Sequence, residues 1–143
     1  MSPLRVSNTN KNTLYLNASS NLSIKIPESV TSIGRNVFSA NKLTSVTIGN
    51  KITSINISTF YNNELTNVVI PDSVTSIGDG AFLNNTLQGS LTIGNKVVNI
   101  GDDAFAENKL TSVIIPKSVI RIGNNTFADN QLVSVVISDS VTS

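Results

Sequence analysis

Carboxylates are the residues of this sequence that come nearest to catalytic chemistry. The 143-residue chain has no His, Cys or Trp, which excludes Ser-His and Cys-His nucleophilic pairs and imidazole or thiolate zinc sites. Asp79 and Asp102 occupy equivalent places in a repeated phrase, but Asn124 stands there in a later copy. We therefore interpret these aspartates and Asp103 as solvated loop residues. We predict that the chain is not an enzyme and needs no metal or cofactor.

A recurring asparagine is the second candidate for chemistry. It stands three residues after each repeated phenylalanine, as Asn41, Asn63, Asn85, Asn108 and Asn130. Such a column could hold a metal or a sugar. The favoured interpretation is structural, because an amide at a repeated turn can bond the backbone of its own and the adjacent coil.

The elements that must position these residues follow from a period of 22–23 residues. An isoleucine recurs as Ile26, Ile48, Ile70, Ile93, Ile115 and Ile137, and a phenylalanine as Phe38, Phe60, Phe82, Phe105 and Phe127. Further columns of Leu, Val and Ile keep the same step. A fixed period of this length is typical of a solenoid whose stacked coils share one core. We therefore predict about five coils.

Glycine and proline also recur in columns. Gly34, Gly78, Gly101 and Gly123, with Asn56 as the exception, predict a tight turn with positive φ. Pro27, Pro71 and Pro116 alternate with Gly49 and Gly94. Because proline lacks an amide donor, we expect it just past a strand end. The alternation indicates that the array grew by copying a two-coil unit.

With these columns in place, the run LTSVxIPxSVTSIGxxAF resembles the BspA-like (Treponema pallidum-type) leucine-rich repeats. The matching residues are Leu43, Val46 and Ile48 of the strand, Pro71, and the pair Ala81 and Phe82. Most coils are one residue shorter than the family's 23, and Asn replaces the family's Cys. The resemblance implies a right-handed solenoid, β-rich, with a parallel concave sheet and short helical or irregular segments near each Phe.

The same resemblance implies a function. It indicates a non-catalytic module of a bacterial-type cell-surface or secreted protein that binds a protein or an extracellular-matrix component through the concave sheet. The outward column there, our predicted partner-binding site, reads Lys25, Thr47, Val69, Thr92, Ile114 and Val136. The apolar members could form a sticky line. The alternative is that β-branched residues simply suit exposed strand positions.

Two other binding classes fit the sequence less well. Thr and Ser columns such as Thr31, Thr53 and Thr75 could match an ice lattice, but Val98 and Ile120 replace them in later copies. A net charge of +1 with no basic run predicts no positively charged surface for binding nucleic acid. We also expect no membrane insertion, since no apolar stretch approaches the length of a span.

The two ends of the chain differ. Residues 1–21 fall outside the register and are predicted to form a degenerate coil or cap, whereas residues 22–143 form the array. The C-terminal end shows no cap in the sequence. We expect either truncation of a longer array or pairing of that end with a second copy. A structural spacer or self-associating array is accordingly the alternative function.

Overall fold

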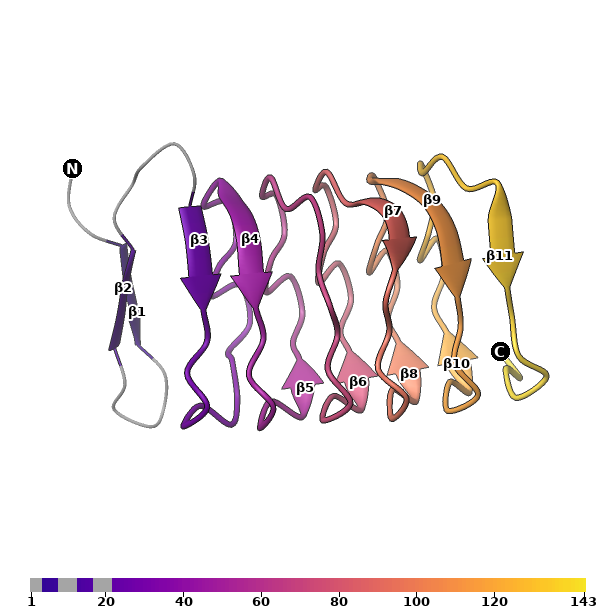
Figure 1. The fold of residues 1–143 in the computed structure, drawn as a ribbon, viewed down its shortest axis with the longest axis horizontal. Helices are drawn as coiled ribbons and strands as arrows, with labels where there is room; N and C mark the ends of the chain where they lie inside the picture. Colours follow the sequence, from indigo (N-terminus) through magenta and orange to yellow (C-terminus); the bar gives the residue numbers. More distant parts are fainter. Residues whose placement is uncertain (1–3, 8–12, 17–21) are drawn as a thin grey trace.

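The computed structural model describes residues 4–7, 13–16 and 22–143, which form a right-handed parallel β-solenoid of about five turns (Figure 1). We number the coils from the first leucine of each strand segment. Coils 1 to 5 cover residues 22–42, 43–64, 65–86, 87–109 and 110–131, and residues 132–143 begin a sixth. The predicted fold class is confirmed.

Two parallel sheets line opposite sides of the solenoid. The first is interrupted at coil 3: β3 (Leu22–Lys25) pairs with β4 (Leu43–Thr47) before it, and β7 (Gln88–Leu91), β9 (Lys109–Ile114) and β11 (Ser134–Val136) follow in the order β11-β9-β7. The second contains β5 (Ser54–Ile55), β6 (Ser76–Ile77), β8 (Asn99–Ile100) and β10 (Arg121–Ile122) in the order β10-β8-β6-β5. The first corresponds to the predicted sheet. The second was not predicted.

The core is a continuous stack of equivalent side chains. Neighbouring phenylalanine rings from Phe38 to Phe127 lie with centroids 5.4, 5.2, 5.2 and 5.7 Å apart and planes within 14°. The first four of the five rings are at most 1% exposed. The Ile, Val and Leu columns are buried around them. The predicted core shared by the stacked coils is confirmed.

The segments around each phenylalanine are turns, and no helix occurs in the part of the chain that the structure describes. Of the expected short helical or irregular segments, the irregular alternative is the one present. In coil 2 the N–H groups of Ser58, Phe60 and Asn62 donate to carbonyls of coil 3 at 2.8–2.9 Å. The interfaces between coils 1 and 5 repeat these three bonds in the same direction. The turns around each phenylalanine thus point their donors toward the C-terminal end, whereas Gly78 N and Gly101 N donate to the preceding coil, to Ile55 O and Ile77 O.

The predicted tight turn does begin at the glycine column, as Ala81 N donates to Gly78 O at 3.2 Å, but the reason for glycine differs from the one predicted. The members of the column do not have positive φ; that conformation falls two residues later, at Asn36, Ser58, Gly80, Asp103 and Asn125. A Cβ on Gly101 would instead lie 2.6 Å from Asp79 N and 2.7 Å from Gly78 C. Glycine is required because the backbone of the preceding coil passes too close for any side chain.

Replacing Gly101 with alanine should therefore lower the free energy of unfolding by about 1–3 kcal/mol, the usual range for overpacking. Urea denaturation followed by circular dichroism measures this change. Gly34→Ala is the matched control from the same column, because its Cβ would meet only the Val37 side chain, at 3.1 Å. Equal losses in the two variants would contradict the close-approach explanation.

The proline column confirms its prediction. Pro27 and Pro116 follow the strand segments that contain β3 and β9, and each proline carbonyl accepts a turn bond, as from Val30 N to Pro27 O at 3.0 Å. The alternation with glycine also has a cause. A Cβ on Gly94 would lie 2.7 Å from the carbonyl carbon of Pro71, so each glycine coil accommodates the proline turn before it.

The N-terminal region is described only in part. β1 (Leu4–Ser7) pairs antiparallel with β2 (Thr13–Leu16), unlike the parallel pairs of the array. Most of the predicted cap over residues 1–21 lies outside the described residues. The division of the chain at that point stays a prediction.

Candidate protein-binding face

We call the outward side of the first sheet, together with the equivalent segment 65–70 of coil 3, the strand face. All six predicted site residues, Lys25, Thr47, Val69, Thr92, Ile114 and Val136, are exposed on it. They pair directly across neighbouring coils as Lys25 with Thr47, Val69 with Thr92, and Ile114 with Val136. The structure therefore places them in one line across the coils.

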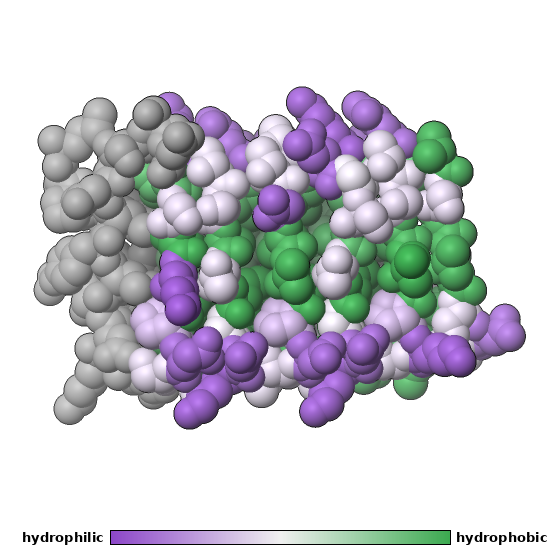
Figure 2. Space-filling model, viewed as in Figure 1, coloured by the Kyte–Doolittle hydropathy of each residue, from purple (hydrophilic) through white to green (hydrophobic). Residues whose placement is uncertain are grey.

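The line arises from strand alternation. Val113 and Ile115 are at most 3% exposed, whereas Ile114 between them is 60% exposed, because successive side chains of a strand point to opposite faces. Val69 and Val136 are 63% and 54% exposed. Figure 2 shows apolar side chains along the middle of this face, with hydrophilic residues gathered along both long edges.

Where the strand segments end, the backbone bonds between coils alternate. Ile26 N donates to Thr47 O at 2.9 Å, Ile70 N to Thr92 O at 3.1 Å, and Ile115 N to Val136 O at 2.8 Å. Among the described residues no corresponding bond joins Ile48 to Val69 or Ile93 to Ile114. The alternation of Pro and Gly coils therefore coincides with these end bonds alone, because β7 and β9 pair coils 4 and 5 further up the strands.

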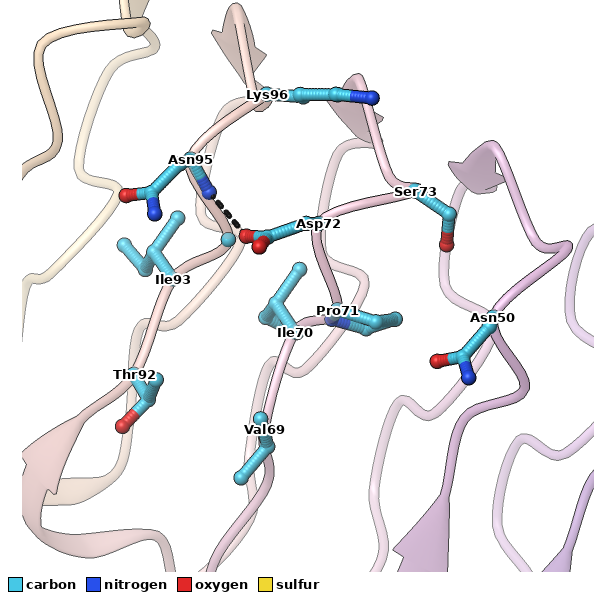
Figure 3. A pocket seen from close by; sticks show the side chains of 11 residues that line it. Asn50, Val69, Ile70, Pro71, Asp72, Ser73, Thr92, Ile93, Asn95 and Lys96 are labelled. Atoms are coloured by element: carbon cyan, nitrogen blue, oxygen red, sulfur yellow. Dashed lines mark hydrogen bonds between the residues drawn. The ribbon is translucent and has the colours of Figure 1, made fainter.

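Two grooves open where the strand segments end, one over each of the proline coils 3 and 5. Groove 1 has a volume of about 710 Å³ and groove 2 of about 670 Å³. Groove 1 is lined by Asn50, Val69–Ser73 and Thr92–Lys96 (Figure 3). Groove 2 is lined by Asn95, Ile114–Ser118 and Val136–Asp139. The sequence analysis missed both, although the recurrence of the Pro turns was the available signal.

The asparagine column is a hydrogen-bond ladder, as favoured from the sequence. Asn63 Oδ1 accepts from Asn41 N at 3.1 Å and Leu43 N at 3.0 Å. Its Nδ2 donates to Phe38 O at 2.8 Å and Phe60 O at 3.0 Å. Asn63 is only 6% exposed. Its amide therefore connects two coils, and both of its polar atoms are used within the protein.

The carboxylates act as acceptors for backbone amides of the following coil. Asp79 Oδ1 accepts from Asp102 N at 3.0 Å, and Asp102 Oδ1 from Asn124 N at 2.7 Å. Asp72 Oδ1 accepts from Asn95 N at 2.7 Å. Within the described ranges no three acidic residues, Cys or His gather as metal ligands would. This arrangement satisfies the solvent-exposed backbone of the turns.

One protein-family model covers most of the chain. The model described as the BspA type leucine-rich repeat region matches residues 8–134 in six copies. The chain belongs to the BspA-type leucine-rich repeat family. Across the described residues of this BspA-type repeat array, no helix has the length and apolarity to cross a membrane.

Solved structures show the same repeat architecture. The pneumococcal vaccine antigen PcpA is 28% identical with a TM-score of 0.74, over 82% of this chain and 31% of that one. A leucine-rich repeat protein from Eubacterium ventriosum is 27% identical with a TM-score of 0.78, over 99% and 40%. One from Bacteroides ovatus, at 24% identity and a TM-score of 0.63 over 83% and 38%, shares the fold.

The BspA-type chain thus spans less than half the length of these structures. No curated protein matches it.

Proposed function

We propose that this BspA-type array is a non-catalytic protein-binding or adhesion module that uses the strand face to bind a protein or extracellular-matrix component. The line of exposed Val69, Ile114 and Val136 carries the proposal. Aligned apolar side chains on a rigid sheet are typical of an interaction site. The family and the vaccine antigen among the structural relatives support a cell-surface or secreted protein.

The chemistry of the face supports binding rather than catalysis. Burying a fully exposed Val or Ile side chain stabilises a complex by about 1.5–3 kcal/mol. Val69, Ile114 and Val136 are each more than half exposed, so most of that surface is available to a partner. The carboxylates Asp79 and Asp102 are engaged with backbone amides. Lys25 and the two threonines of the line add polar contacts that orient a partner.

A panel of purified, immobilised extracellular-matrix proteins first identifies one that binds the wild-type chain. Val69→Lys/Ile114→Lys should weaken binding to that protein by about tenfold or more. The two ammonium groups would interrupt the apolar line and carry an unpaired charge into the interface. Biolayer interferometry measures the dissociation constants.

Ile120→Lys is the matched control, because Ile120 is an exposed β-branched residue beside β10 in the second sheet. It should retain affinity within about twofold. Binding that survives the double variant, or that Ile120→Lys removes equally, would rule out the strand face as the site.

A second candidate is self-association through the C-terminal end. Val135 and Ile137 belong to core columns, yet they are 45% and 58% exposed there. The N–H groups of Asn125, Phe127 and Asp129 occupy the forward-donating positions of coil 5, with no acceptor among the described residues. At these three positions a second copy would have to offer carbonyl acceptors.

Light scattering across a wide concentration range tests this candidate. Self-association should give a mass that increases with concentration, and Val135→Lys/Ile137→Lys should suppress the increase. A monomer at every concentration would contradict it.

A further inference from the structure

We propose that grooves 1 and 2 together bind a polyproline II peptide segment that carries two apolar side chains three residues apart, with an acidic residue between them. The inference rests on the proposed function of the strand face and specifies the chemistry of its partner.

The two grooves are copies of one site. Val69, Pro71 and Ser73 of groove 1 correspond to Ile114, Pro116 and Ser118 of groove 2, and Asn50 corresponds to Asn95. The exposed side chains of Val69 and Ile114 provide each groove with an apolar wall. Figure 3 shows Lys96, Asp72 and Ser73 at one end of groove 1 and Val69 and Thr92 at the other. A partner with a matching internal repeat would present equivalent apolar side chains to both grooves.

The spacing of the grooves selects the backbone conformation. They are two coils apart, about 10 Å at the usual 4.7–4.9 Å per parallel strand. A polyproline II helix returns to the same face every three residues, after about 9 Å. A β-strand returns to one face after about 7 or 13 Å, neither of which matches. The polyproline II repeat therefore places equivalent side chains in both grooves.

The polar groups of the grooves support the same backbone. Ser73 Oγ and Ser118 Oγ are the buried side-chain atoms without a hydrogen-bond partner in the described part of the chain. Because no bond holds either hydroxyl, rotation about χ1 toward the groove breaks none. A polyproline II segment has no internal hydrogen bonds, so its carbonyls need donors. An α-helix, which also returns to one face after about 10.5 Å, would leave these hydroxyls unused.

Charge determines the residue between the two apolar side chains. Lys96 and Lys117 lie on the neighbouring coils 4 and 5, whereas Asp72 and Asp139 lie on the outer coils 3 and 6. Neither lysine forms an ion pair with a described residue. An acidic side chain between two apolar anchors would lie near both ammonium groups. A basic one would meet like charge.

Fluorescence polarisation with the labelled octapeptide APLPELPA tests the inference, because its leucines are three residues apart and flank a glutamate. We expect saturable binding, about tenfold tighter than to APLELPPA, in which the spacing is two, and to APLPKLPA, in which the charge is reversed. Ile114→Lys should weaken binding by about tenfold. Lys96→Glu/Lys117→Glu should invert the preference between the glutamate and lysine peptides.

Equal binding of the three peptides, no binding of any, or a preference unchanged by the charge reversal would overturn the inference. Failure of the broader proposal is distinguishable from these results. If the peptides fail while Val69→Lys/Ile114→Lys still weakens matrix binding, the strand face binds another chemistry. If the double variant also has no effect, the strand face itself is excluded.

Discussion

Phe82→Ala is expected to lower the free energy of unfolding by about 3–5 kcal/mol, the range for deleting a buried aromatic side chain. Phe82 is fully buried, and its ring stacks on Phe60 and Phe105 with centroids 5.2 Å away on each side. Removing it leaves a void that both neighbours border. Each coil is stabilised by its neighbours. A void at Phe82 therefore weakens the contacts of the central coil with the coils on both sides. Urea denaturation monitored by circular dichroism measures the change.

Two control variants test whether burial in the stack causes the loss of stability. Tyr61→Ala removes a partly exposed aromatic next to the stack, and its cost should stay near about 1 kcal/mol. Phe127→Ala removes the terminal ring, which is half-buried and stacks on one side only, so its cost should be intermediate. A loss of less than about 1 kcal/mol for Phe82→Ala would contradict a buried aromatic spine.

Asn85→Leu is expected to cost about 2–6 kcal/mol, although it replaces a polar buried residue with an apolar one. Asn85 Oδ1 accepts from Leu65 N at 3.1 Å, and Nδ2 donates to Phe60 O at 2.9 Å and Phe82 O at 3.1 Å. Leucine leaves the buried Leu65 N–H without a partner, at about 1–3 kcal/mol, and removes two further bonds. Asn67→Leu on the exposed strand face should change stability by about 0.5 kcal/mol or less.

Asn85→Asp tests the hydrogen bonds of the ladder independently of packing, because aspartate keeps the shape of the asparagine side chain. Its carboxylate would face two carbonyl oxygens in a buried site, which raises the pKa of the new carboxyl above its value in the unfolded chain. The folded state then binds the proton more tightly. The variant should be closest to wild type in acid and lose stability as pH rises toward neutral. A loss of stability that does not change with pH would contradict the two bonds that Asn85 Nδ2 donates to Phe60 O and Phe82 O.

The sequence alone determined the solenoid, its core columns and the asparagine ladder. In a stacked array each residue meets the equivalent residue of the next coil, so a column of identical residues reports a repeated contact. Phe82 and Asn85 could be assigned in this way because their burial follows from the period. The exposure of Ile114 followed from strand alternation between Val113 and Ile115.

Other features depended on contacts between coils that no local pattern expresses. The strands of the second sheet are two residues long, too short to show alternation. Gly101 is needed because the backbone around Asp79 passes beside it, whereas the sequence indicated only the turn's own dihedral angles. The direction of the hydrogen bonds around each phenylalanine and the shape of the two grooves likewise arise only when separate coils lie side by side. Tertiary structure decided these features because their causes lie about one coil away along the chain.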